Sequence, residues 1–193
     1  MARFDLSRYD GVLAFGRVLA DLYAARRLTR RAFVFHEAAD TRLFRPHEPP
    51  AGAERGDLVW IGNWGDDERT RELDEFLLGP VAALRLRAVV HGVRYPDSAK
   101  AALARAGLLY RGWIANAQAP ALFAAHRVTV HVPRRPYAEA LPGIPTIRVF
   151  EALACGIPLV SAPFREAKKA MCIDVLWCLI CCQSKSLRAI PRS

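Results

Sequence analysis

The chain has 193 residues, of which 52% are hydrophobic and 24% charged, a balance typical of a globular protein with an ample core. This length predicts one domain, or one domain with a piece of another. The formal charge of +9 admits a nucleic-acid or phosphate partner, but the basic residues are scattered and show no aromatic-basic interleaving of an RNA-binding type. We therefore expect no nucleic-acid partner.

Membrane and secretory signals are not visible in the sequence. No apolar run approaches the roughly 20 residues that a membrane-spanning helix needs, and Met1 to Asp5 lacks the apolar core of a signal peptide. Cys155 stands alone in the body of the chain, which is not the cysteine pattern of a secreted disulfide-bonded domain. The sequence therefore predicts a cytoplasmic protein with no transmembrane segment.

The first elements along the chain form a strand-helix-strand unit. An apolar run over 10–16 predicts a buried strand, apolar residues at helical spacing over 17–27 predict a helix, and 31–36 is the next strand. Three elements cannot cover both faces of a sheet. We expect 1–45 to be the tail end of a truncated N-terminal domain with its interdomain segment, followed by a linker or turn over 49–56.

Strands and helices alternate from residue 57 onward. Strands are predicted over 57–62, 86–92, 108–113, 128–132 and 157–160, and helices over 67–78, 96–106, 117–125 and from Pro145 to a glycine stop at Gly156. Gly79-Pro80 is expected to break the first helix, before a further short one. This alternation predicts an α/β fold over 57–164, a Rossmann-like parallel sheet with helices on both faces.

The tail after Phe164 differs in character from the body. It contains four of the five cysteines, and Cys178 and Cys181 have zinc-knuckle spacing without a second pair or a nearby histidine. We therefore expect no metal site and interpret 165–193 as an atypical tail, disordered or frameshifted.

Unusual polar and glycine residues gather where the predicted strands end. In a parallel sheet, ligands bind outside the carboxyl ends of the strands. The turns at those ends, 62–65, 91–94, 111–113 and 134–146, hold most of these residues. A site is therefore expected at this edge.

The helix after the last turn begins with features that suit an anion. Its first turn carries Thr146 and Arg148 and no acidic residue, so its free amides could receive a phosphate. We predict an apolar face formed by Ile147, Phe150 and Leu153-Ala154. Glu151 has two interpretations at this point, an exposed glutamate on an ordinary helix or a ligand-binding acid.

Several motifs carry a family resemblance that covers roughly residues 9–164. The run Arg148-Val-Phe-Glu-Ala-Leu-Ala-Cys-Gly-Ile-Pro-Leu-Val160 resembles the "(F/L)EA(L/M)A(C/S)G-x-P" signature of GT-B glycosyltransferases of the group 1 type, and the CgeB-like spore-maturation subgroup looks most similar. Val34-Phe-His-Glu-Ala-Ala-Asp40 before Phe44-Arg-Pro46 is similar to the interdomain segment of that family. Val59-Trp-Ile-Gly-Asn63 and Tyr110-Arg-Gly-Trp113 resemble its donor-domain turns.

The resemblance implies two facing Rossmann-like domains, of which the C-terminal one binds a nucleotide-sugar donor without a resident metal or other cofactor. It implies that Glu151 binds the donor ribose, that residues near Thr146 face the diphosphate, and that the turn at Trp113 lies along the base. The donor-binding residues expected on this basis are Gly62, Asn63, Arg69, Trp113, Ile114, Thr146, Arg148 and Glu151.

The chain departs from the family at one acidic position. Many members carry a glutamate eight residues before the helix glutamate, and that position is Gly143 here. Glu139 is close in sequence but nothing places it there. His36 is expected to be a structural histidine at a strand end, the alternative being a histidine that points into the cleft. The catalytic residues stay unassigned. We expect a donor domain that transfers sugar to an unknown acceptor and is impaired in this chain, the alternative being a non-catalytic nucleotide-binding or regulatory module.

Overall fold

The structure is a computed structural model that describes residues 5–49, 51–52, 54–65, 69–141 and 144–162. The predictions for Gly143 and for the tail 165–193 lie outside this range. The chain divides into two compact units, one over 1–36, 137–144 and 163–193, the other over 37–136 and 145–162. Within the described ranges, no helix is long and apolar enough to cross a membrane.

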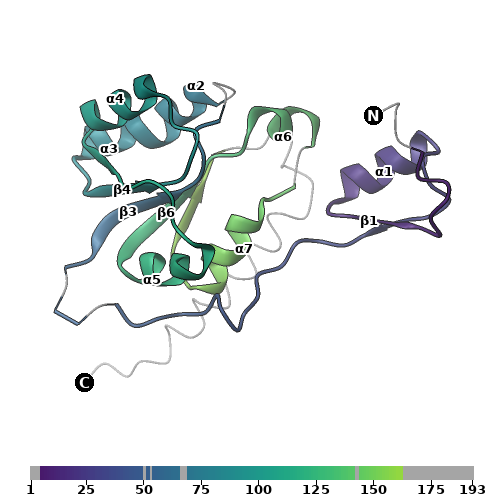
Figure 1. Cartoon of the computed structure of the whole chain (residues 1–193), viewed down its shortest axis with the longest axis horizontal. Helices are drawn as coiled ribbons and strands as arrows, with labels where there is room; N and C mark the ends of the chain where they lie inside the picture. Colours follow the sequence, from purple (N-terminus) through teal and green to yellow (C-terminus); the bar gives the residue numbers. More distant parts are fainter. Residues whose placement is uncertain (1–4, 50, 53, 66–68, 142–143, 163–193) are drawn as a thin grey trace, which may run out of the picture. The chain divides into compact units, whose positions relative to one another are not determined.

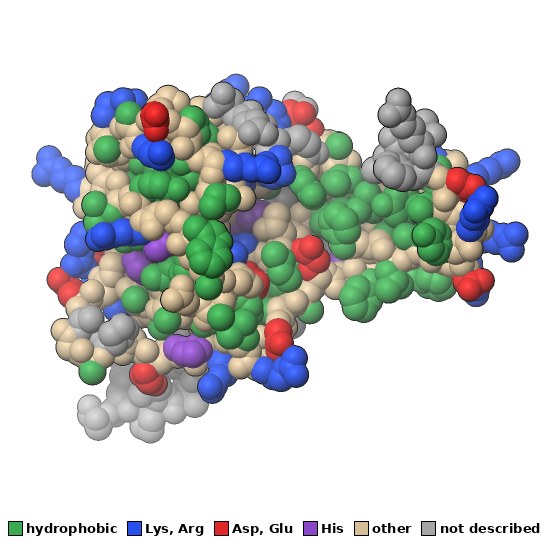
Figure 2. Space-filling view, in the orientation of Figure 1, with side chains coloured by type: hydrophobic (Ala, Val, Ile, Leu, Met, Phe, Trp, Pro, Cys, Tyr) green, Lys and Arg blue, Asp and Glu red, His purple; other side chains and the backbone are tan. Residues whose placement is uncertain are grey.

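The first unit is the predicted strand-helix-strand motif. It contains β1 (Val12–Ala14), α1 (Arg17–Ala25) and β2 (Ala32–Val34), and the two strands pair in parallel. Helix α1 buries Leu19 against Ile144 on one face of the strands. Leu13 and Phe33, which are partners across the strands, are 64% and 51% exposed. Figure 2 shows hydrophobic side chains gathered on the surface of this unit.

The second unit is built on a five-stranded parallel sheet in the order β5-β4-β3-β6-β7 (Figure 1). Its strands are β3 (Gly56–Ile61), β4 (Ala88–His91), β5 (Leu108–Tyr110), β6 (His126–His131) and β7 (Leu159–Ser161). Its helices are α2 (Thr70–Leu73), the π-helix η1 (Asp74–Leu78), α3 (Gly79–Leu84), α4 (Asp97–Arg105), the 3₁₀-helix η2 (Asn116–Gln118), α5 (Ala119–Ala124) and α7 (Ile147–Ala154), while α6 (Arg135–Ala140) crosses the division between the units. The predicted α/β fold with a parallel sheet is confirmed.

Helices cover both faces of this sheet, as Figure 1 shows for α3 and α4 on one side and α5 and α7 on the other. Strand β3 shows why, because successive side chains of a strand point to opposite faces. Leu58 and Trp60 pack in the core beneath α2, α3 and α4. Val59, between them, packs in a second core with Phe123 of α5 and Ala152 of α7. The hydrophobic run of the central strand thus serves two cores.

The expected helix break at Gly79-Pro80 is wrong. The chain stays helical from Thr70 to Leu84, with the five-residue π-helix directly before Gly79. A π-turn re-routes backbone hydrogen bonds, which lets a helix pass a proline that has no N–H to donate. A side chain at Gly79 would bring a Cβ within 3.1 Å of the Asp74 carbonyl, so the glycine also fits this tight segment.

Two further boundaries near the last helix need correction. The segment 134–146, predicted as a turn, contains helix α6. Helix α7 starts at Ile147 with Thr146 as its N-cap, so Pro145 precedes the helix instead of occupying its first position. Gly156 has φ of 73°, the left-handed conformation expected of the residue that follows a helix end.

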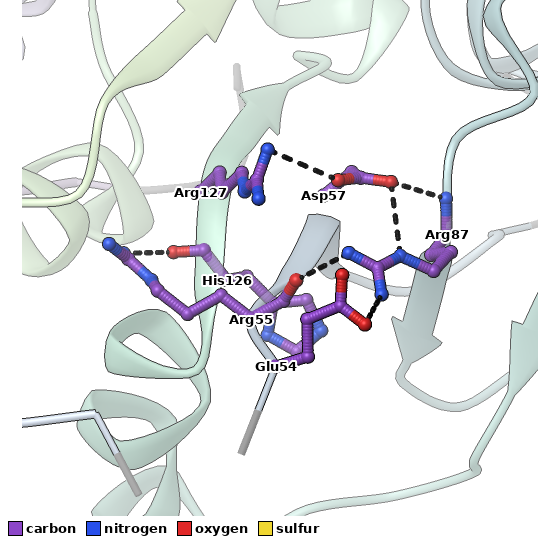
Figure 3. Close-up of polar contacts among 6 residues, drawn as sticks. All are labelled: Glu54, Arg55, Asp57, Arg87, His126 and Arg127. Carbon is purple, nitrogen blue, oxygen red and sulfur yellow. Dashed lines mark hydrogen bonds and ion pairs between the residues drawn. The ribbon is translucent and has the colours of Figure 1, made fainter. Parts of the chain in front are cut away.

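Charged residues connect the strands at the amino edge of the sheet (Figure 3). Asp57 of β3 accepts a hydrogen bond of 2.9 Å from the backbone N–H of Arg87, just before β4. The Arg87 guanidinium lies 2.6 Å from Glu54 and donates to the Arg55 carbonyl at 2.9 Å. Arg127 Nη1, on β6, is 3.9 Å from Asp57. We call these residues, with His126, the amino-edge cluster.

Candidate functional site

The opposite, carboxyl edge of the same sheet carries the donor-binding residues predicted from the sequence. Gly62 and Asn63 follow β3, Trp113 and Ile114 lie in the segment after β5, and Arg69 directly precedes α2. Thr146, Arg148 and Glu151 belong to the N-cap and first turns of α7. All eight residues fall in the second unit.

Glu151 is buried, with 4% of its surface exposed, so the interpretation as an exposed glutamate is wrong. Asn116 Nδ2 donates a hydrogen bond of 3.1 Å to its Oε1. Arg148 Nη1 lies 2.6 Å from Oε2 and also donates to Asn116 Oδ1 at 3.1 Å. The arginine is close enough to balance the charge, but among the described residues no donor makes a hydrogen bond to Oε2. Oε2 is itself buried, and its close cationic neighbour is the Arg148 guanidinium.

The buried face of α7 differs from the predicted one. Val149 and Ala152 are buried, whereas Ile147, assigned to the apolar face, is 38% exposed. The helix has apolar residues around most of its circumference, so periodicity alone does not select a face. Contacts of α7 with α5, β6 and β7 determine which face of the helix is buried, and they bury Glu151 as well.

Asn116 is a site residue that sequence reasoning missed. It opens η2, two residues after Ile114, and joins both Glu151 and Arg148 through its side chain. A local signal existed, since an amide side chain stands at the start of a helix in an otherwise mostly apolar stretch. The sequence pattern did not indicate that Asn116 contacts Glu151, 35 positions away.

Asn63 and Arg69 both make contacts that hold the turn after β3. Asn63 Oδ1 accepts a hydrogen bond of 3.0 Å from the backbone N–H of Val93. Arg69 donates to the Val132 carbonyl at 2.8 Å and to the Asn63 carbonyl, and its guanidinium carbon lies 5.5 Å from the centre of the Trp60 ring. These bonds link the ends of β3, β4 and β6. Donor binding by Asn63 and Arg69 stays a prediction.

Three glycine-containing turns lie against one another at the ends of β3, β4 and β5. A Cβ on Gly92 would come within 1.9 Å of the Gly62 carbonyl oxygen, so this approach requires glycine. The Gly92 N–H donates to the Gly112 carbonyl at 2.9 Å. Trp113 follows and is 72% exposed, an aromatic face available to a ligand. Ile114, beside it, is half-buried.

The segment 37–46 lies along α7 and was not predicted to contribute to the site. Phe44 is 3% exposed in the core that contains Ala152 of α7. At the other end of the segment, Glu37 is half-buried. Burial and the nearby Glu151 charge raise the pKa of Glu37, while the Ile147 amide lowers it.

The environment of α7 also changes Cys155, which follows its last residue. Burial, followed by the Glu151 charge, raises the pKa of this thiol to about 11. Cys155 is thus a half-buried thiol without the features of a nucleophile. Among the residues that the structure describes, no three His, Cys, Asp or Glu side chains form a group suited to a metal ion.

Known proteins share the fold at low sequence identity. TarM of S. aureus, in complex with fondaparinux, α-GlcNAc-glycerol and UDP, is 11% identical with a TM-score of 0.56, covering 80% of this chain and 30% of its own. The pneumococcal O-GlcNAc transferase GtfA, in complex with UDP and GlcNAc, is 10% identical with a TM-score of 0.54, covering 80% and 30%. Sucrose-phosphate synthase from Thermosynechococcus elongatus is 17% identical with a TM-score of 0.55, covering 81% and 41%.

These neighbours are GT-B glycosyltransferases, and the described sheet with its helices matches their fold. The chain spans less than half the length of each of them. No curated protein matches the chain. The family model described as glycosyl transferase-like matches residues 69–174, more than half of the 193 residues and a range that includes Asn116, Arg148 and Glu151. The chain belongs to the glycosyl transferase-like family.

Proposed function

We propose that residues 57–164 form the donor-binding domain of a glycosyltransferase that binds a nucleotide-sugar and transfers its sugar to an acceptor. The observation that carries this proposal is the buried Glu151 carboxylate, which Asn116 and Arg148 hold in place at the carboxyl edge of the sheet. The two vicinal hydroxyls of a ribose are donors that such a carboxylate can bind. Within the glycosyl transferase-like family, we assign the chain to the CgeB-like subgroup.

The surroundings of Glu151 support the other parts of a nucleotide. Arg148 and the first amides of α7, beginning after Thr146, supply positive charge and N–H donors for a diphosphate. The exposed ring of Trp113 offers a surface for the base. Two structural neighbours, TarM and GtfA, are described with UDP, which makes a uridine nucleotide the first donor to test.

We propose that the reaction uses no resident metal or other cofactor. A departing nucleoside diphosphate needs its negative charge stabilised, and a helix start with a basic side chain supplies this. Arg148 and α7 fill that role on the described side of the site. The acceptor is a partner whose chemistry this domain does not indicate.

Calorimetric titration with UDP tests the nucleotide site. Wild type is expected to bind, and Glu151→Gln, which keeps the shape of the side chain, is expected to bind at least tenfold more weakly because it loses a charge-assisted bond to ribose. Glu75→Gln makes the same chemical change on an exposed glutamate of η1 and serves as the control. Equal affinity of Glu151→Gln and wild type would remove the ribose assignment.

Transfer requires a separate measurement. A panel of nucleotide-sugars is incubated with the protein, and released nucleoside diphosphate is quantified. Release that depends on Glu151 supports a glycosyltransferase. Tight UDP binding without release from any donor supports the alternative, a non-catalytic nucleotide-binding or regulatory module.

A further inference from the structure

Two tyrosine hydroxyls hold backbone carbonyls of the glycine turns at the carboxyl edge of the sheet. The Tyr95 hydroxyl, just before α4, donates a hydrogen bond of 2.7 Å to the Gly62 carbonyl in the turn after β3. The Tyr110 hydroxyl, on β5, donates a hydrogen bond of 2.9 Å to the Gly92 carbonyl in the turn after β4. Because glycine has no side chain to restrict its backbone, these bonds fix two turns that could otherwise adopt several conformations.

The two tyrosines belong to one aromatic group. Their ring centroids lie 4.5 Å apart, and the Tyr95 ring also lies 5.8 Å from the Trp64 ring and 6.4 Å from the Trp60 ring. Tyr95 is 7% exposed, and burial raises the pKa of its hydroxyl, which therefore keeps its proton to donate. A buried hydroxyl without an acceptor costs free energy, so packing and hydrogen bonding favour the same position of this side chain.

The carbonyl that Tyr95 holds lies where two turns contact each other. A Cβ on Gly92 would come within 1.9 Å of the Gly62 carbonyl oxygen, the atom that accepts from Tyr95. The Gly62 N–H donates to the His91 carbonyl at 2.9 Å, so both backbone polar groups of this glycine have partners. A shift of the Gly62 carbonyl would therefore disturb the turns after β3 and β4 together.

The side chain of Asn63, the next residue, takes its orientation from the same two turns. Its Oδ1 accepts a hydrogen bond of 3.0 Å from the backbone N–H of Val93, which follows Gly92. This bond uses the oxygen end of the amide. Asn63 is exposed, so the two N–H donors of its Nδ2 stay accessible at the carboxyl edge, where they suit a ligand rich in acceptor oxygens such as a phosphate.

We propose that Tyr95 and Tyr110 are positioning residues, which hold the two turns so that the Asn63 amide faces the phosphates of a bound nucleotide-sugar. The proposal rests on the nucleotide site described under the proposed function. The tyrosines act through the backbone and make no contact with the ligand themselves. Their effect is on affinity for the phosphate part of the donor, and a nucleoside without phosphate does not depend on them.

Calorimetry with UDP and uridine compares Tyr95→Phe with a matched variant, Thr129→Val. Each change removes the hydroxyl of a buried side chain that donates a bond of 2.7 Å to a backbone carbonyl, that of Gly62 or that of Val59. Both variants are expected to unfold at a lower temperature than wild type. Only Tyr95→Phe is expected to weaken UDP binding, by about fivefold, with uridine affinity unchanged. Tyr110→Phe should show a smaller loss, because this side chain is only half-buried.

A double-mutant cycle with Asn63→Ala tests the route from the tyrosine to the ligand. Asn63→Ala removes the amide, so adding Tyr95→Phe to it is expected to cause no further loss of UDP affinity. A tyrosine with a merely structural role would lower the affinity by the same factor in both backgrounds. The non-additive loss is therefore the result that identifies a positioning residue.

Other results overturn the proposal, each in a recognisable way. If Tyr95→Phe and Thr129→Val change UDP affinity alike, Tyr95 has no role beyond folding. Additive losses in the double variant would separate Tyr95 from Asn63, and an equal loss of uridine affinity would separate it from the phosphates. If wild type does not bind UDP, the nucleotide site itself is wrong, and this inference falls with it. Tyr110→Phe provides the same comparison if Tyr95→Phe does not fold.

Discussion

The two edges of the five-stranded sheet both carry charged residues, but the charges are placed differently. At the amino edge, the side chains of Glu54 and Arg87 are 75% and 49% exposed, and they pair with each other. At the carboxyl edge, Glu151 is almost completely buried and pairs with a half-buried Arg148. The ion pair at the amino edge is exposed to solvent, whereas the ion pair at the carboxyl edge is largely buried.

This difference changes what each group of charges contributes to the free energy of folding. Exposed ion pairs are screened by solvent and contribute little to stability. A buried carboxylate costs free energy unless nearby donors or cations satisfy its oxygens. At the carboxyl edge, Arg148 and Asn116 are the partners of the buried Glu151 carboxylate.

The largest expected effect comes from His131, buried at the carboxyl end of β6. Burial, followed by the Arg69 charge, lowers the pKa of this histidine to about 4 in the folded chain. Between pH 6.5 and pH 4 the unfolded chain binds the extra proton and the folded chain does not. Stability is therefore expected to fall by about 3 kcal/mol as the pH falls through this window. Urea unfolding at several pH values measures it.

The matched control for this prediction is a solvent-exposed histidine of the same chain. His131→Asn should remove most of the pH dependence in this window, whereas His47→Asn, at an exposed position, should keep the wild-type profile. A His131→Asn variant with the full wild-type slope between pH 6.5 and pH 4 would show that other groups cause the acid sensitivity. The acid sensitivity would then not come from the buried histidine at the carboxyl edge.

The second effect concerns Asn116, the amide that joins Glu151 to Arg148. Asn116→Ala leaves Glu151 Oε1 without its hydrogen bond of 3.1 Å and is expected to cost about 1–2 kcal/mol of unfolding free energy. UDP affinity should fall as well, because the carboxylate is no longer held in place. Thermal unfolding and calorimetry on the same samples measure both.

Asn116→Asp sharpens this experiment, because it keeps the size of the side chain and adds a second carboxylate beside Glu151. It should lower UDP affinity at least as much as Asn116→Ala. Full UDP affinity in both variants would show that the ion pair with Arg148 alone orients Glu151. The polar network would then be a feature of folding and not of the site.

The fold followed from the sequence more fully than the site did. The alternation of apolar strands and helical periods predicted the parallel sheet, because burial on both faces dictates that pattern. The passage of the helix through Gly79-Pro80 was not predictable, since it depends on a π-turn selected by packing. Asn116 was missed for a similar reason, because its role arises from a partner that is distant in sequence.

A smaller effect is expected for Trp113, which is 72% exposed beyond the end of β5. Trp113→Ala should leave stability unchanged, because the ring adds little to the core. Affinity for uridine should fall about fivefold, or about 1 kcal/mol, if the base lies on the ring. Trp113→Phe should recover most of the lost uridine affinity. Equal uridine affinity in wild type and Trp113→Ala would separate this residue from the site.

The smallest effect is expected at the amino edge, where Arg87 bridges Glu54, Asp57 and the Arg55 carbonyl. Arg87→Ala removes the side-chain bonds but keeps the backbone N–H that donates to Asp57 at 2.9 Å. Because these pairs are solvent-exposed, the melting temperature should change by no more than about 2 °C, and less still in high salt. UDP affinity should not change. A large loss of affinity in Arg87→Ala would mean that the two edges are coupled through the strands, and the contrast between a structural edge and a binding edge would no longer hold.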